Sequence, residues 1–175
     1  MVEHNHNTET KEWIQAIIIA VILALLIRNF VVEVFQVDGE SMFATLHDGD
    51  RLAVNKFIYK IRTPRKGEII VFKYPSNPKY DYIKRVIAVE GDVVEIKDGI
   101  VFVNDVALNE EYILCNTNGS FGPEKIPKNH LFVLGDNRNN SRDSRFPSVG
   151  HIPLANVKGK AICIIWPLGR LGVVN

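Results

Sequence analysis

The chain has 175 residues, of which 46% are hydrophobic and 23% are charged, and its formal net charge is +1. This length suffices for one sizeable core or for a core with a small insert. A net charge close to zero gives no reason to expect nucleic acid as a partner. Cys115 and Cys163 lack metal-ligand spacing and the five histidines are scattered, so the sequence predicts no metal and no cofactor.

The N-terminal part contains the long apolar run of the sequence. Residues 1–12 are polar and are expected to be a disordered tail. Residues 13–32 surround the wholly apolar stretch 16–27 and reach the roughly 20 residues of a bilayer-spanning helix. A buried core helix and a cleavable signal peptide are alternatives, but the residues after Arg28 offer no small-residue cleavage site. We therefore predict an uncleaved signal anchor over 13–32, in contact with membrane lipids.

The remaining residues, 36–175, show the pattern of a mainly β domain. Asp98-Gly99 separates two apolar runs and predicts a β-hairpin with a type I′ turn. Residues 105–129 are rich in loop-forming residues. We expect an antiparallel sheet or barrel-like domain with its core in 36–91 and 131–170 and a small hairpin-based insert over 92–130. Runs of apolar or alternating residues predict strands over 51–56, 68–74, 82–90, 93–97, 100–104, 130–134 and 160–166.

Two residues suggest chemistry. Ser41 follows Gly39 in a short segment past the apolar run, where glycine permits a tight turn and backbone N–H groups can bind an oxyanion. Lys84 lies in the apolar strand pattern 82–87. The ordinary interpretations are a turn-forming serine and an exposed edge-strand lysine. In the alternative, burial lowers the pKa of the lysine, and the neutral amine activates the serine as a nucleophile.

A third segment, residues 135–145, is dense in short polar side chains. Asp143 and Arg145 are close enough in sequence to form an ion pair that orders this loop. Asp136 with Asp143 suggests a metal site or an acid pair, but no further acidic or histidine cluster supports either one. His47, six residues after Ser41, leaves a serine–histidine hydrolase as an alternative.

These segments together resemble the bacterial type I signal peptidases, in particular the short Gram-positive kind. The resemblance runs from the anchor to Trp166. The five motifs that carry it, in order, are Gly39–Met42 with Thr45-Leu46, Gly49–Arg51 with Val54–Lys56, Lys66–Phe72, Tyr82–Ile87 with Gly91-Asp92, and Gly135–Asn137 followed by Ser141, Asp143, Ser144 and Arg145.

The resemblance implies a serine endopeptidase with a Ser–Lys dyad. Ser41 would be the nucleophile and Lys84 the general base. Ser141 would hydrogen-bond the lysine amine, Asp143 and Arg145 would hold the loop, and Gly39 would support the site. The residues that would form shallow apolar substrate pockets are Met42, Tyr82, Ile83 and Val86.

The resemblance also implies the substrate and the location. The substrate would be a preprotein whose signal peptide is cut after small residues, with the export translocon as a further partner. The N-terminus would be cytoplasmic and the β domain would lie outside the cell membrane. Two alternatives remain: a self-cleaving repressor-type Ser–Lys protease, and a catalytically inactive membrane-tethered binding module.

Overall fold

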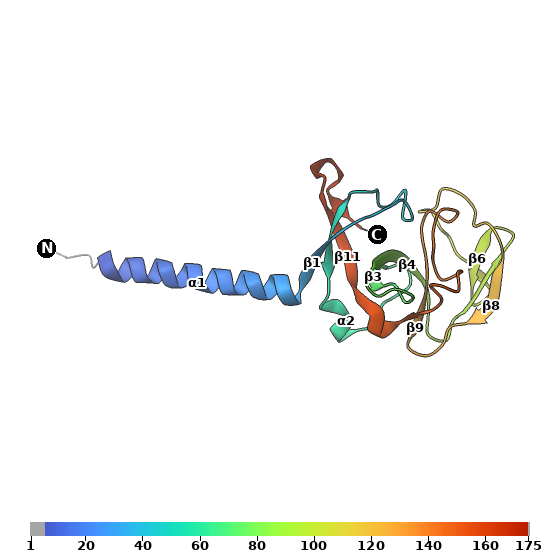
Figure 1. Cartoon of the computed structure of the whole chain (residues 1–175), viewed down its shortest axis with the longest axis horizontal. Helices are drawn as coiled ribbons and strands as arrows, with labels where there is room; N and C mark the ends of the chain where they lie inside the picture. The colour runs from blue at the N-terminus through green and yellow to red at the C-terminus, as the bar shows by residue number, and fades with distance from the viewer. Residues whose placement is uncertain (1–5, 175) are drawn as a thin grey trace.

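The computed structural model describes residues 6–174, and side chains within them for 10–24 and 31–174. Helix α1, His6–Phe30, leads into the β structure and extends away from it (Figure 1). The predicted tail therefore lies partly outside the described residues, and from His6 onward it is helical, contrary to the prediction of disorder. Over the described residues, no helix is long and apolar enough to span a membrane. The anchor stays a prediction.

The described residues form two antiparallel sheets, one of eight strands and one of four, so the prediction of a mainly β fold is confirmed. The larger sheet has the order β1-β2-β11-β3-β4-β9-β10, and β12 also pairs with β11. Its strands are β1 (Val32–Gln36), β2 (Arg51–Asn55), β3 (Ile69–Lys73), β4 (Asp81–Val89), β9 (His130–Leu134), β10 (Ile152–Pro153), β11 (Val157–Trp166) and β12 (Gly172–Val173).

The smaller sheet has the order β7-β6-β5-β8 and is formed by residues between β4 and β9 (Figure 1). Its hairpin turns at Asp98 and Gly99, which both have positive φ, as a type I′ turn requires. Pro123 lies in β8, within a stretch expected to be loop; an edge strand tolerates proline because one side needs no donor. The strands are β5 (Val93–Lys97), β6 (Ile100–Val103), β7 (Val106–Ala107) and β8 (Phe121–Lys125).

Short helical turns connect the strands: α2 (Ile58–Ile61), η1 (Leu154–Asn156) and η2 (Leu168–Arg170). Within the part of the chain that the structure describes, three apolar clusters form the core. One packs Met42 and Leu46 against β2 and β11, so the segment that carries Ser41 is held to the sheet by its neighbours. Another packs the smaller sheet against β4 and β9, through residues such as Val94 and Phe132. Burying these apolar side chains removes apolar area from water and stabilises the fold. Loops whose side chains belong to a cluster are thereby held against the sheets.

The β domain begins earlier than predicted. β1 starts at Val32, and its five residues pair with β2 from Val32↔Asn55 to Gln36↔Arg51. The sequence prediction placed residue 32 in the anchor and began the domain at 36. Apolar and polar residues alternate over 32–36, but the apolar run continues directly into this segment. Because apolar side chains suit both a helix end and a strand, the sequence did not show where the helix ends.

Candidate active site

Ser41 and Lys84, which are 43 residues apart in the chain, meet in the structure. Ser41 lies in the turn after β1, and Lys84 lies near the middle of β4, where its Cα pairs with Ile70 of β3. The Lys84 Nζ donates to Ser41 Oγ at 2.6 Å and to the Ile83 carbonyl at 2.8 Å. This is the distance that proton transfer between two side chains requires.

The lysine is 4% exposed. Burial disfavours the charged amine and lowers the pKa of Lys84 to about 8, although the carboxylates of Asp143 and Asp136 oppose that shift. A substantial fraction of the amine is therefore neutral at mildly alkaline pH. A neutral amine can accept a proton, which an ordinary surface lysine cannot do near neutral pH.

A cavity of about 270 Å³ opens beside this pair. Three of the four predicted substrate-contacting residues, Met42, Tyr82 and Ile83, line it. Residues that were not predicted also line it: Arg142, the segment Gln36–Asp38, and Tyr80 with Asp81. Arg142 could have been recognised from its place between two residues of the 135–145 motif.

Val86 does not line the cavity. The prediction that it contacts substrate is therefore wrong. It is fully buried in a core cluster with Ile70 and Phe72. β9 occupies the edge of β4 from Arg85 to Val89, with Val86↔Val133 paired, and the Val86 side chain packs in a cluster that also contains Val149 and Ile152. Substrate therefore reaches only the earlier part of β4.

The residues Asp81–Lys84 pair with β3 on one side. Over the described residues, β9 pairs with β4 only from Arg85 onward. The other edge of 81–84 is thus not paired in the described sheet, and these residues line the cavity together with the segment Gln36–Asp38. An open strand edge can accept an extended peptide by β-augmentation.

The predicted bond from Ser141 to the lysine amine is not formed. Ser141 Oγ is buried, and among the described residues it has no hydrogen-bond partner. It lies against Gly135 instead: a Cβ added to Gly135 would be 2.2 Å from Ser141 Oγ and 2.4 Å from the Ser41 carbonyl oxygen. Glycine at 135 therefore allows the loop to approach Ser41 closely.

The other predicted supporting residues hold loops around the pair. Arg145 Nε and Nη2 donate to the two Asp143 oxygens at 2.8 and 2.9 Å, and Asp143 accepts from the Gly135 N–H at 3.1 Å. Gly39 has φ +86°, a left-handed conformation that favours glycine, and its N–H donates to Asp48. His47 packs its ring on Phe43, and its backbone N–H donates to Asp50.

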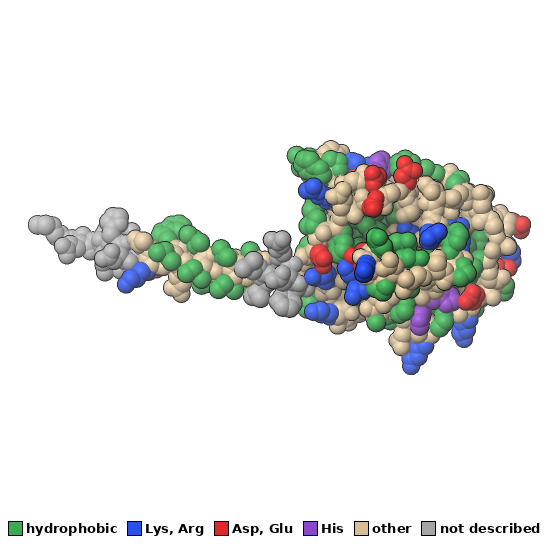
Figure 2. Space-filling view, in the orientation of Figure 1, with side chains coloured by type: hydrophobic (Ala, Val, Ile, Leu, Met, Phe, Trp, Pro, Cys, Tyr) green, Lys and Arg blue, Asp and Glu red, His purple; other side chains and the backbone are tan. Residues whose placement is uncertain are grey.

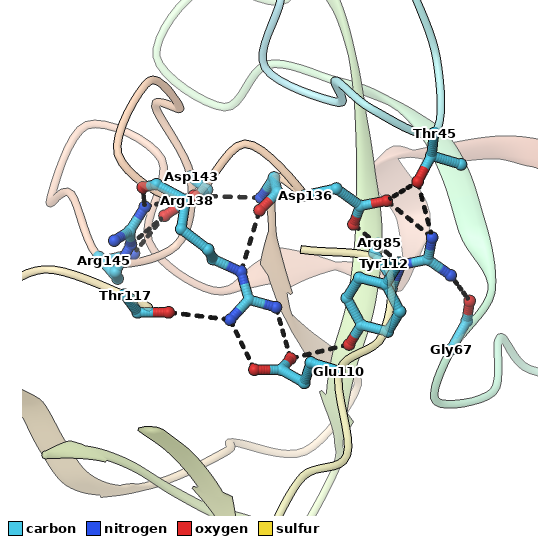
Figure 3. A network of polar contacts seen from close by, with 11 residues as sticks. Thr45, Gly67, Arg85, Glu110, Tyr112, Thr117, Asp136, Arg138, Asp143 and Arg145 are labelled. Carbon is cyan, nitrogen blue, oxygen red and sulfur yellow. Dashed lines mark hydrogen bonds and ion pairs between the residues drawn. The ribbon is translucent and has the colours of Figure 1, made fainter. Parts of the chain in front are cut away.

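A buried polar network that sequence reasoning missed surrounds these loops (Figure 3). Arg85, next to Lys84 in β4, donates to both oxygens of Asp136, and Thr45 Oγ1 donates to Asp136 at 2.5 Å. Arg138 pairs with Glu110 from the loop between the small-sheet strands. Arg85 and Asp136 stood inside recognised motifs, but no local signal connected Glu110 with Arg138.

The acidic residues of the site do not assemble into a metal centre. Within the part of the chain that the structure describes, there is no group of three or more histidine, cysteine or acidic residues placed to hold a metal ion. The Asp136 and Asp143 carboxylates are each engaged by an arginine.

Comparisons with known proteins identify the family to which the chain is similar. A profile of the family described as "Signal peptidase, peptidase S26" matches residues 10–166. A signal peptidase I from Leptolyngbya laminosa is 44% identical over 169 residues, covering 92% of this chain and 82% of that protein. Signal peptidase I T from Bacillus subtilis (strain 168) is 38% identical and covers 97% and 96%.

A solved structure is also similar. The crystal structure of a signal peptidase I from Enterococcus faecalis V583 superposes with a TM-score of 0.51 at 31% identity, covering 57% of this chain and 97% of that one. The family profile extends over most of the chain, and the relatives cover nearly all of it at well over 30% identity. By its sequence and its fold, this chain belongs to the signal peptidase family of S26 peptidases.

Proposed function

We propose that this protein removes N-terminal signal peptides from exported preproteins, with Ser41 as the nucleophile and Lys84 as the general base. The observation that carries the proposal is the 2.6 Å contact between Lys84 Nζ and Ser41 Oγ at the wall of an open cavity. The relatives named signal peptidase I support the choice of substrate.

In the first step, the neutral Lys84 amine takes the Ser41 hydroxyl proton while Oγ attacks the carbonyl carbon of the scissile bond. The carbonyl electrons move to oxygen and form a tetrahedral oxyanion. The Ser41 backbone N–H, in the turn that follows Gly39 at φ +86°, would donate to that oxyanion. Collapse of the intermediate breaks the C–N bond, and the Lys84 ammonium gives its proton to the departing amine.

The second half removes the acyl group. Water loses a proton to the Lys84 amine and attacks the ester carbonyl, and the resulting intermediate releases the signal peptide's new carboxylate. Ser41 Oγ then recovers its proton from Lys84. The same lysine serves both halves because its lowered pKa lets it alternate between base and acid.

The open edge of Asp81–Lys84 supports binding of the substrate as an extended strand. Alternate side chains of a strand point to the same side. The side chains of the first and third residues before the cut would then point toward Met42 and Ile83 in the cavity, while the side chain of the second would face outward. Met42 and Ile83 are held in place by their core neighbours. The part of the cavity next to them would therefore accept small side chains better than large ones.

We further propose that residues 13–30, the helical part of the predicted anchor, are a membrane anchor, with the N-terminus cytoplasmic and the β domain outside the cell membrane. Apolar side chains on the described part of α1 are exposed, among them Trp13 (72%) and Ile17 (59%), and Figure 2 shows them along the projecting helix. An unpartnered apolar helix needs an apolar surrounding. Membrane lipids, and the translocon that delivers preproteins, would then be its partners.

The test is cleavage of a synthetic peptide that spans a signal-peptide cut site. We expect Ser41→Ala and Lys84→Arg each to lower kcat at least a thousandfold, because arginine keeps the charge but cannot be deprotonated. Lys97→Arg is the matched control: Lys97 is an exposed lysine of the smaller sheet, and its variant should keep parental turnover. Substantial turnover by folded Lys84→Arg would remove the general-base role.

A pH profile gives a second readout. Only the neutral amine is active as a base, so kcat/KM should rise as pH increases and level off above about 8, where the pKa of Lys84 lies. A profile that is flat from pH 6 to pH 10 would count against the dyad. A catalytically inactive binding module would bind the peptide without any turnover.

A further inference from the structure

The loop between β7 and β8, residues 108–120, reaches out of the smaller sheet and contacts the 135–145 loop. Arg138 is 1% exposed and donates from Nη1 to Glu110 Oε2 at 2.8 Å and to Thr117 Oγ1 at 3.0 Å. Its Nη2 also donates to Glu110 Oε1. A buried arginine held on two sides in this way has little freedom to move.

Tyr112 connects the same loop to β4. The Arg85 guanidinium lies 3.9 Å from the centre of the Tyr112 ring, and the phenol donates to Glu110 Oε1 at 2.8 Å. Burial, reinforced by the Glu110 carboxylate, raises the pKa of Tyr112, so the phenol stays protonated. The loop thus contacts the residue next to Lys84 through Tyr112 and the 135–145 loop through Glu110 (Figure 3).

Contacts inside the 135–145 loop lead from Arg138 to Ser41. Arg138 Nε donates to the Gly135 carbonyl at 3.1 Å, and the Arg138 carbonyl accepts from Arg145 Nη2 at 2.5 Å. The Asn137 N–H donates to the Ser41 carbonyl at 3.1 Å. The close approach of Gly135 to the Ser41 carbonyl places this backbone directly against the nucleophile's residue.

We propose that Glu110 and Tyr112 of the 108–120 loop are positioning residues: through Arg138 and Arg85 they hold the 135–145 loop and β4 so that Ser41 and Lys84 stay in contact. The inference rests on the proposed Ser41–Lys84 function. Neither Glu110 nor Tyr112 lines the cavity, so both act through other residues. A displacement of the reacting groups by about 1 Å can cost a hundredfold in rate, which makes such support effective.

The charges of this cluster make the proposal testable by the direction in which each variant shifts the pH profile of activity. Glu110 neutralises Arg138 in a buried setting, so Glu110→Gln leaves an extra positive charge near the site and Arg138→Met leaves an extra negative one. The first should lower the apparent pKa of the activity profile and the second should raise it. The charged or titratable groups that line the cavity or act on the Lys84 amine, which stay the same in both variants, are Asp38, Tyr80, Asp81, Tyr82, Asp136, Arg142 and Asp143.

The experiment measures kcat, KM and the pH profile on the full chain in detergent, for Glu110→Gln, Arg138→Met, the double variant and Tyr112→Phe. We expect kcat to fall about tenfold or more in the first three, with KM within about twofold of the parent's. Tyr112→Phe should fall by less, since it keeps the ring over Arg85. The profile should shift to lower pH for Glu110→Gln, to higher pH for Arg138→Met, and return toward the parent's in the double variant.

Arg62→Met is the matched control, because Arg62, Glu68 and Tyr59 form a second arginine–glutamate–tyrosine cluster elsewhere on the domain, in which the arginine and the tyrosine both donate to the glutamate. It should leave kcat and the profile unchanged. Circular dichroism identifies the folded variants, and the double variant, which removes both charges, keeps the test open if a single variant does not fold.

Two results would overturn the proposal: kcat within twofold of the parent's in the folded variants, or a loss of kcat without opposite shifts of the profile. Ser41→Ala, assayed alongside, separates this from the proposed function. If Ser41→Ala is inactive while the cluster variants match the parent, only the positioning role fails. If Ser41→Ala keeps parental turnover, the Ser–Lys function itself fails.

Discussion

Arg85 and Asp136 form a bidentate ion pair beside the lysine of the dyad, with Nε–Oδ1 at 2.9 Å and Nη2–Oδ2 at 2.7 Å. The side chains are 3% and 0% exposed. Arg85 follows Lys84 in β4, and Asp136 follows Gly135 in the loop that approaches Ser41. The pair therefore fastens the strand of the base to the loop behind the nucleophile.

Asp136→Asn should destabilise the protein by about 3 kcal/mol or more, because removing one partner leaves a buried charge without its compensating carboxylate. Urea unfolding of the two proteins measures the difference. Glu33→Gln, in the exposed pair with Lys56, is the control and should change stability by less than about 1 kcal/mol. Equal effects of the two variants would mean that burial of the Arg85–Asp136 pair has no energetic consequence.

Lys84→Met should make the protein more stable at pH 7 while abolishing turnover. The folded-state pKa of Lys84, about 8, is below its ordinary value of 10.5, so burial of the charged amine destabilises the parent below pH 8. Between pH 8 and 10.5 the unfolded chain binds more protons, and the parent's stability rises with pH. The gain, up to about 3 kcal/mol, should shrink across that window.

The measurement for Lys84→Met is the free energy of unfolding of both proteins at pH 7, 8, 9 and 10. Lys56→Met, at a partly exposed lysine, should show almost no gain and no comparable trend. A Lys84→Met variant less stable than the parent at pH 7 would show that the bonds to Ser41 and Ile83 outweigh the cost of burial.

Peptides with alanine at the first and third positions before the cut should be cleaved well. Phenylalanine at the first position should cost about 2 kcal/mol or more, since overfilling a packed site forces strain, and that corresponds to roughly thirtyfold or more in kcat/KM. A series that varies one position at a time tests this. Equal cleavage of the alanine and phenylalanine peptides would contradict a cavity walled by Met42 and Ile83.

Removal of residues 1–30 should leave a folded domain, whereas removal of residues 1–36 should not. The first cut retains Val31, whose carbonyl accepts from the Lys56 N–H, and all of β1. The second deletes β1 and exposes the edge of β2. It also removes Phe35, which packs against a core cluster, and so uncovers part of that cluster. Thermal unfolding followed by circular dichroism distinguishes the two. A cooperative transition at the same temperature in both would show that β1 is dispensable.

Much of the strand structure was determined by local pattern. The strands Val93–Lys97 and His130–Leu134 have the predicted bounds, and the Asp98-Gly99 turn joins the hairpin as expected. These features depend on period-two alternation and on residues that tolerate positive φ, and both are local properties of the chain. The pairing of Ser41 with Lys84 as candidates came from motif types and from the family resemblance.

Only the tertiary structure decided which groups meet. It placed Val86 in a core cluster rather than in the cavity, turned the Ser141 hydroxyl toward Gly135, and joined Glu110 to Arg138. Alternation along a strand says which side chains share a face. It does not say which strand pairs with its edge, where that pairing stops, or which residues pack on that face. Contacts between residues far apart in the chain depend on the order of strands in the sheet, and in this protein that order builds the site.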